Sequence, residues 1–291
     1  MTNTLASNSR VLLSSLNRNQ TTLDRHLARL GSGTRLLTPA DDPAGTRTAA
    51  KADSQRARLA AATINIQNGT SRLQTTDSYL TSLGDTLTRM SELATYARNE
   101  VLSPDDVDLY RREFVQLQEQ LRTVIGGTQA QIGGTADIQT PLGSYNGAPL
   151  FGADGGTLLA IGVHADETLQ LPTINLRTGD THTLIEQDAA GTFTLDLTAP
   201  DAIATLQDAL SQITTGLIAV GATQSRLSHA SDTINSTDAA LESQTSRIRD
   251  VDIAASTTAL VRQQVLTQSH TSMLSQTREM STKLLSLLTA D

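Results

Sequence analysis

The chain has 291 residues, no cysteine and no tryptophan, and its formal net charge is −8. These features exclude disulfides and thiolate chemistry, and without a basic block they argue against a nucleic-acid partner. The longest apolar runs fall short of the roughly 18 residues that a membrane span needs, and the first residues lack the pattern of a secretory signal. Leu, Ala, Ile and Val supply most of the apolar side chains, which favours thin helical bundles over a thick aromatic core.

The first segment, residues 5–30, is predicted to be an amphipathic helix. Its apolar face carries Leu12, Leu16, Leu23, Leu27 and Leu30. Gly31 and Gly33 are expected to end it. In the link that follows, Asp42 can accept hydrogen bonds from free helical N–H groups, and Pro43 suits the first position of the next helix.

A second helix is predicted over residues 44–98, with aliphatic residues spaced seven apart. This seam consists of Leu59, Ile66, Leu73, Leu80 and Leu87. Ser103 and Pro104 indicate the start of a third helix by the same capping logic, and Gly126-Gly127 indicates its end.

Residues 128–198 lose the helical period and become rich in Gly and Thr, which predicts a small β region inserted between helices. The expected strands are 158–161, 168–171, 181–185 and 192–197, with turns at 177–180 and 188–191.

The longest predicted helix begins after Thr198 and Asp201, which could form a capping box. Its seam repeats every seventh residue through Leu206, Ile213, Val220, Leu227, Ile234, Leu241 and Ile248. Such a helix would be roughly 60 Å long. Because the second helix has the same period, we expect the two long helices to pair.

Residues 254–288 are predicted to form a last amphipathic helix. Its stripe holds Leu266, Met273, Met280, Leu284 and Leu287. Both terminal helices have one narrow apolar stripe and no partner nearby in sequence, and isolated helices of this kind are marginal in water. We therefore predict that both ends are disordered in the free monomer and fold against other copies.

The fold class expected from these segments is mainly α, a long antiparallel helical bundle with a small β region and helical termini. The predicted division of the chain is 1–44 (half of an inner domain plus a linker), 45–127 (bundle), 128–198 (β region), 199–253 (bundle) and 254–291 (the other half of the inner domain).

No arrangement of residues indicates catalysis, a metal or a cofactor, and we do not expect an enzyme. The five histidines are scattered without ligand spacing, at His26, His164, His182, His229 and His270. Asp41-Asp42 and Asp105-Asp106 each begin a helix, so capping explains these paired carboxylates better than acid–base chemistry.

Several short motifs, in order along the chain, resemble those of bacterial flagellins. They are Gly31-Ser-Gly-Thr-Arg35, Ala40-Asp-Asp-Pro-Ala-Gly45, Asn68-Gly-Thr-Ser-Arg-Leu-Gln-Thr75, Tyr145-Asn-Gly-Ala-Pro-Leu150, Val220-Gly-Ala-Thr-Gln-Ser-Arg-Leu227, Ser246-Arg-Ile-Arg-Asp-Val-Asp252 and Leu284-Leu-Ser-Leu-Leu288. Each motif is weak alone, but their order and spacing at both ends are specific.

The resemblance implies a subunit that polymerises with itself into an extracellular flagellar filament for swimming. It also implies an export chaperone, a type III export apparatus, and hook-associated and cap proteins as partners. Thr38-Pro-Ala-Asp-Asp-Pro43 is closer to the hook–filament junction protein, which is the alternative. An unrelated coiled-coil regulatory rod is a further alternative, and seeding filament fragments with the protein separates the three.

The family resemblance also suggests contact with an innate immune receptor through Arg89, Leu93 and Glu113. The competing interpretation is structural, with Arg89 and Glu113 as solvated surface residues and Leu93 as packing.

Overall fold

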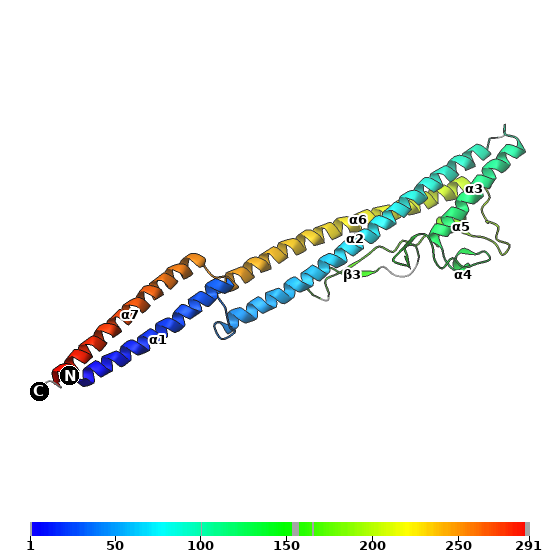
Figure 1. Cartoon of the computed structure of the whole chain (residues 1–291). Helices are drawn as coiled ribbons and strands as arrows, with labels where there is room; N and C mark the ends of the chain where they lie inside the picture. Colours follow the sequence, from blue (N-terminus) through cyan, green and yellow to red (C-terminus); the bar gives the residue numbers. More distant parts are fainter. Residues whose placement is uncertain (1, 100, 153–156, 165, 289–291) are drawn as a thin grey trace. The chain divides into compact units, whose positions relative to one another are not determined.

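A computed structural model describes residues 2–99, 101–152, 157–164 and 166–288, with side chains described from residue 10 to residue 283 inside those ranges. The elements in chain order are α1 (Thr2–Ser32), α2 (Pro43–Ala97), α3 (Pro104–Ile125), α4 (Gln129–Ile132), β1 (Ser144–Tyr145), β2 (Ala148–Pro149), β3 (Leu158–Ala160), β4 (Thr168–Gln170), α5 (Asp180–Ile185), α6 (Ala202–Arg249) and α7 (Ile253–Leu288). The mainly helical class with a small inserted β region is confirmed (Figure 1).

Two of three predicted helix caps are confirmed, and the capping box predicted at Thr198 and Asp201 is wrong. The backbone N–H of Gly45 donates to the Asp42 carboxylate at 2.9 Å, and Pro43 is the first residue of α2. Ser103 accepts a hydrogen bond from the N–H of Asp106 at the start of α3. Thr198 behaves differently, because its hydroxyl donates to Asp196 at 2.6 Å four residues before α6 begins. Side chains therefore accept hydrogen bonds from the free N–H groups at two of these three helix starts.

The contacts divide the chain into two compact units, which we call the terminal unit (residues 1–56 and 238–291) and the central unit (residues 57–237). Both α2 and α6 contribute residues to each unit. The boundaries therefore lie within helices, and the five-part division of the sequence stays a prediction.

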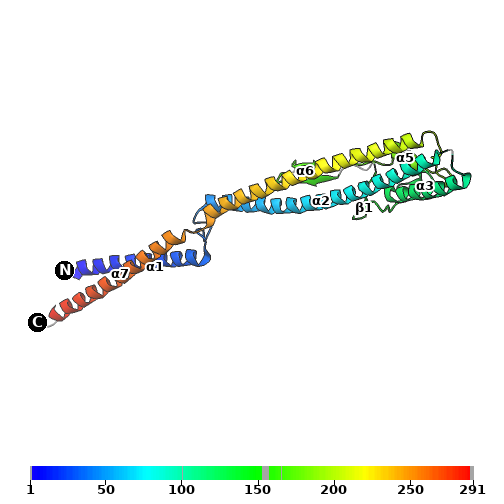
Figure 2. The same cartoon turned by 90° about the horizontal axis from the view of Figure 1, so that it is seen from above.

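In the central unit α2 and α6 lie side by side in both views (Figures 1 and 2). Their seams meet closely: a Cβ added at Gly216 would lie 3.4 Å from Leu80, and one added at Gly69 would lie 3.5 Å from Leu227. The seam residues of this unit are all between 0% and 6% exposed. They are Leu59, Ile66, Leu73, Leu80, Leu87, Leu206, Ile213, Val220, Leu227 and Ile234.

Helix α3 packs beside the end of α2, and polar side chains join it to the segment that follows. The buried Arg122 guanidinium donates to the carbonyls of Ile132, Ile185 and Gly133 at 2.6, 2.9 and 2.8 Å. Gln118, which is 0% exposed, donates to the carbonyls of Leu184 and Leu195. Buried backbone carbonyls need such partners where no sheet or helix supplies them.

Two of the four predicted strands are present. β3 and β4 pair antiparallel, with Leu159 opposite Leu169. The hairpin rests on α2, where Asn65 donates to the carbonyl of Ala160 at 3.1 Å. Gly69 leaves room there for the Leu159 side chain, which lies 2.7 Å from the position a Cβ would take.

The strand predicted at residues 181–185 is wrong, because these residues form α5. Gln212 on α6 accepts hydrogen bonds from the N–H and hydroxyl of Thr181, and Leu184 and Ile185 are fully buried. These tertiary contacts outweigh the β propensity of Thr and Ile, which is weak and depends on context.

The strand predicted at residues 192–197 is also wrong. Its alternating pattern marks Leu195 and Leu197, which are 6% and 1% exposed. However, the only β pairing of this segment within the described residues is a single bridge between Gln187 and Phe193. A period of two identifies buried residues, but a strand also needs a neighbouring strand.

In the terminal unit α1 and α7 pack against each other, and they lie side by side in both views (Figures 1 and 2). The links at their ends also meet, since the N–H of Val251 donates to the carbonyl of Gly33 at 3.1 Å and Arg35 donates to the carbonyl of Ile248. The terminal helices lack partners nearby in sequence, but each is the partner of the other. The disorder of both helices in the free monomer stays a prediction.

Candidate functional site

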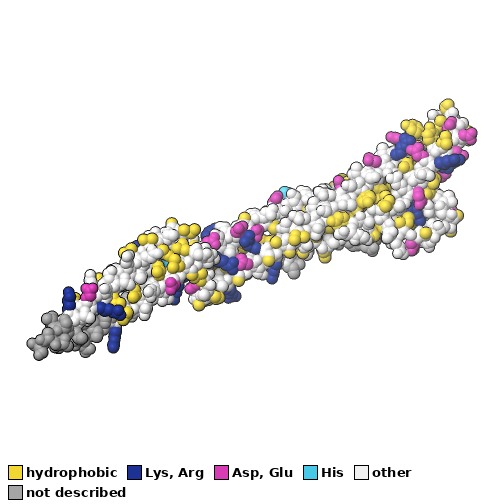
Figure 3. Space-filling view, in the orientation of Figure 1, with side chains coloured by type: hydrophobic (Ala, Val, Ile, Leu, Met, Phe, Trp, Pro, Cys, Tyr) yellow, Lys and Arg dark blue, Asp and Glu magenta, His cyan; other side chains and the backbone are white. Residues whose placement is uncertain are grey.

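The most exposed apolar surface of the terminal unit lies on α7. Six large apolar side chains of α7 are between 41% and 65% exposed, and hydrophobic atoms gather on the visible side of this helix in Figure 3. The six are Ile253, Val261, Val265, Leu266, Met273 and Met280. We call the last five, which share one side of the helix, the α7 outer face. It contains the predicted residues Leu266, Met273 and Met280, whereas the side chains of Leu284 and Leu287 lie outside the described residues.

The half-buried side of α7 has a different composition. It carries Ser256, Ala259, Leu260, Gln263, Thr267, His270, Leu274 and Thr277. Most of these side chains are polar, whereas large apolar side chains of α7 stay exposed. That arrangement is the reverse of what the burial of apolar area would select in a molecule that stays alone.

The α1–α7 interface contains polar side chains. Gln263 donates to the backbone carbonyl of Asn19 at 3.3 Å. The Nδ2 atom of Asn19 and the Nδ1 atom of His270 are buried and have no hydrogen-bond partner. Unsatisfied buried polar groups carry a free-energy penalty. These two atoms reduce the net stability that the pair gains from its contacts.

The leucine stripe of α1 lies partly against α7. Its members Leu12, Leu16, Leu23 and Leu30 are half-buried, whereas Leu27 is 50% exposed. Two further apolar residues of α1, Val11 and Leu13, are 60% and 41% exposed. None of the described side chains of α1 is buried.

Sequence reasoning missed five exposed apolar residues of the terminal helices. They are Val11, Leu13, Ile253, Val261 and Val265. The last two are four residues apart, which places them on one side of a helix, so the i, i+4 spacing could have identified them. A search confined to one seven-residue row passes over them.

The remaining seam residues of α6, Leu241 and Ile248, belong to the terminal unit and are only half-buried. Nearby, Arg56 binds the Asp238 carboxylate at 2.9 Å and Arg249 binds Asp53 at 2.7 Å. The hydrogen bond that Arg56 donates to Asp238 raises the pKa of Arg56. Ion pairs thus accompany the seam where its burial declines.

Of the three residues suggested for receptor contact, two are on the surface and one is not. Arg89 donates to Glu113 at 2.7 Å and also pairs with Glu92 at 3.0 Å. The hydrogen bond that Arg89 donates to Glu113, followed by the one it donates to Glu92, raises the pKa of Arg89. Leu93 is 0% exposed, so its side chain packs inside the central unit.

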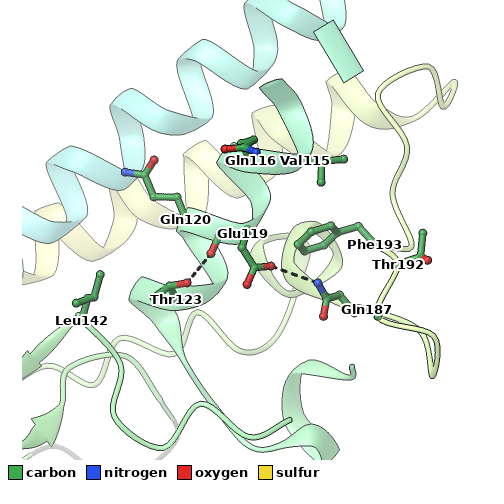
Figure 4. Close-up of a pocket in the computed structure, with 10 residues that line it drawn as sticks. Val115, Gln116, Glu119, Gln120, Thr123, Leu142, Gln187, Thr192 and Phe193 are labelled. Carbon is green, nitrogen blue, oxygen red and sulfur yellow. Dashed lines mark hydrogen bonds between the residues drawn. The ribbon is translucent and has the colours of Figure 1, made fainter. Parts of the chain in front are cut away.

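A surface pocket of about 710 Å³ lies beside the second half of α3. Its lining includes Glu119 and Gln187, which point toward each other and share a hydrogen bond of 3.3 Å, and the ring of Phe193 (Figure 4). The pocket opens to solvent, and the Glu119 carboxylate already accepts a hydrogen bond from the Gln187 amide. Elsewhere among the described residues, no three His, Asp or Glu side chains gather to hold a metal ion. Within the same ranges no helix could span a membrane.

Both ends of the chain match known sequence families. The bacterial flagellin N-terminal helical region matches residues 2–131, and the bacterial flagellin C-terminal helical region matches residues 203–288. These two ranges contain both terminal helices and both long helices of the bundle.

Curated relatives match along nearly the whole chain. A flagellin of Listeria monocytogenes is 30% identical over 269 residues, covering 91% of each chain. A flagellin of Halalkalibacterium halodurans is 29% identical and covers 90% of each. The flagellar filament 33 kDa core protein of Treponema phagedenis is 28% identical, covering 91% of this chain and 92% of its own. These matches do not favour the hook–filament junction protein. The protein belongs to the bacterial flagellins, the structural subunits of the extracellular flagellar filament.

Proposed function

We propose that this flagellin enters the filament by burying the α7 outer face and the exposed apolar residues of α1 against neighbouring copies. The observation that carries the proposal is that large apolar side chains of α7 stay exposed. Fully burying an aliphatic or Met side chain contributes about 1.5–3 kcal/mol. Repeated identical contacts that do not close on themselves produce a helical polymer.

The contacts between α1 and α7 support the same proposal. Within the monomer this pair buries no large side chain among the described residues and leaves polar atoms of Asn19 and His270 unsatisfied. We infer that the pair opens easily in the free subunit and becomes stable between copies. Circular dichroism and hydrogen exchange before and after assembly test this inference. An equal helix content and equal protection in both states would contradict it.

Seeded elongation tests the assembly surface directly. The double variant Val265→Ser, Met273→Ser should extend filament fragments much more slowly than the parent, because both side chains belong to the α7 outer face. The matched control is Ile218→Ser, which alters an equally exposed aliphatic residue, 68% exposed, on the central unit. The control should elongate normally. A double variant that elongates like the parent would refute the role of this face.

Deletion of residues 1–30 or 254–291 is the coarser test. Each deletion should abolish elongation while the central unit keeps its cooperative unfolding, because the buried seam lies within residues 57–237. Loss of the cooperative transition would mean that the terminal helices are required for folding itself. A full-length chain that caps seeds without extending them would indicate a junction adaptor instead.

We also propose a narrower receptor epitope than the sequence suggests. On the folded chain a receptor could reach Arg89 and Glu113, whereas Leu93 would act by supporting the helix beneath them. A receptor-reporter assay with Arg89→Ala and Glu113→Ala tests this, with Arg112→Ala as an exposed control on α3. A response unchanged in both variants, or absent in the parent, would remove the proposal.

Membership in the family supports a further proposal about delivery. We propose an export chaperone, the type III export apparatus, and hook-associated and cap proteins as partners. Secretion of the chain by cells with an intact or an inactivated export apparatus tests the second of these. Equal secretion from both would contradict it.

A further inference from the structure

The chain contains two Asn-Gly dipeptides in contrasting conformations. Asn68-Gly69 lies in the interior of α2, and Asn146-Gly147 forms the turn between β1 and β2. Asn146 has φ of 50° and Gly147 has φ of 77°. Positive φ at both central residues is characteristic of a type I′ hairpin turn, for which Asn-Gly is a preferred sequence. Both asparagines are exposed, so exposure does not distinguish them.

We propose that Asn146 is a site of spontaneous deamidation in the folded protein and that Asn68 is protected. The amide nitrogen of Gly147, having lost its proton to hydroxide, attacks Cγ of the Asn146 side chain. The new C–N bond closes a five-membered imide, and the side-chain nitrogen leaves as ammonia. Water then adds to one of the two imide carbonyls and opens the ring to aspartate or isoaspartate. No electrons are gained or lost, and water is the only other reactant.

The turn leaves the reacting atoms accessible. Gly147 is exposed, and a Cβ placed on it would meet no atom within 4 Å. The pairing of Tyr145 with Ala148 encloses the dipeptide without using the Gly147 N–H in the ladder. Glycine also offers the least steric hindrance to the attack, because it has no side chain.

The base of the hairpin is anchored, because the N–H of Leu150 donates to the carbonyl of Gly143 and the N–H of Gly143 donates to the carbonyl of Val124, but the turn lies beyond these contacts. Each strand has two residues, and the second pair joins Ser144 to Pro149, which has no N–H to donate. A two-stranded hairpin of this size is marginal by itself. Small local openings let Asn146 reach the backbone angles that ring closure requires.

The dipeptide Asn68-Gly69, in contrast, is restrained by its surroundings. As an interior residue of α2, Gly69 uses its N–H in the helical hydrogen-bond series. Gly69 is buried, and the side chains of Leu159 and Leu227 close over the place where a Cβ would be. Ring closure at Asn68 would require α2 to unwind at the seam of the central unit.

Deamidation would change both charge and backbone. It adds a carboxylate to the central unit, which already holds eleven more acidic than basic residues. Isoaspartate also routes the main chain through the former side chain. The added methylene would break the register between Tyr145 and Ala148.

Peptide mass spectrometry of the full chain, incubated in mildly alkaline buffer, tests the proposal. We expect the mass gain of amide-to-acid conversion at Asn146 about 100-fold faster than at Asn68, because openings of a surface turn are far more frequent than those of a core helix. In denaturant the two sites should react at similar rates. The variant Asn146→Gly keeps a turn that tolerates positive φ and should lose the signal from this peptide.

Two results would overturn the proposal. One is equal reaction at Asn68 and Asn146 in the folded chain, which would show that the conformation does not select the site. The other is an Asn146 that stays unmodified when folded but reacts in denaturant, which would show that the turn protects it. Neither outcome depends on whether the chain elongates filament seeds, so this inference and the assembly proposal can fail separately.

Discussion

The terminal unit and the central unit are both built from long helices, but they bury different kinds of residue. In the central unit the largest side chains below 2% exposure include Phe114, Phe151, Leu80 and Met90. In the terminal unit the buried side chains among those described are Ala49, Ala52 and Thr245. The central unit therefore has a core of large side chains, whereas the terminal unit leaves apolar side chains exposed.

The two units also differ in their balance of charge. The terminal unit contains thirteen Lys or Arg and ten Asp or Glu, whereas the central unit contains nine and twenty. Like charges on the central units of adjacent copies repel one another, and salt screens that repulsion. The apolar terminal surface must supply enough attraction to overcome it. From this contrast we expect a bundle that folds by itself and a pair of helices that assembly completes.

The largest effect is expected from the core of the central unit. Leu80→Ala should lower the free energy of unfolding by about 2–5 kcal/mol, because it removes a fully buried side chain and leaves a cavity. Urea unfolding measures the change. The matched substitution Leu27→Ala on α1 should change it by less than about 0.5 kcal/mol, since that residue is half exposed. Equal losses for the two variants would abolish the contrast between the units.

A second prediction concerns the polar contacts that hold the segment after α3. Arg122→Met should destabilise the central unit by about 2–3 kcal/mol, because the carbonyls of Ile132, Gly133 and Ile185 lose a buried charged donor. Burial lowers the pKa of Arg122. Limited proteolysis should then cut within residues 128–198 sooner than in the parent. Arg112→Met, an exposed change on the same helix, should leave both measurements unchanged.

A smaller effect is expected from the ion pairs of Arg89. Arg89→Ala should reduce the melting temperature only slightly, because its pairs with Glu113 and Glu92 are exposed and screened by solvent. High salt should reduce the difference between the variant and the parent. A loss as large as that of Leu80→Ala would mean that the pairs are coupled to the core beneath them.

The smallest effect should appear in acid at the link between α1 and α2. The backbone N–H of Thr38, and then that of Leu37 and the charge of Arg29, hold the pKa of Asp41 below its ordinary value. Because the folded pKa is the lower one, this carboxylate stabilises the link above its ordinary pKa, and that contribution is lost as the pH falls through the folded value. Asp41→Asn should flatten this part of the pH profile. NMR titration of Asp41 at its ordinary pKa would contradict the prediction.

Much of the fold could be predicted from the sequence because its determinants are local. The spacing of Leu59 to Leu87 and of Leu206 to Ile248 identifies the paired seams, and Asp42 and Ser103 identify helix starts. The strand at 168–170 was predictable for the same reason, since alternation and turns lie within a few residues. Each of these signals depends on neighbours within one or two turns.

The sequence by itself determined that the chain is a set of long helices with apolar rows, because the helical period and the capping residues depend on residues that are close together in the chain. Only the tertiary structure decided that Thr181 begins a helix, that Arg122 and Gln118 hold distant carbonyls, and that α7 turns Gln263 and His270 toward α1 while Val265 and Met273 face outward. The physical reason is that a helix with two usable faces has no local preference between them. The choice depends on the free energy of contacts with residues far along the chain.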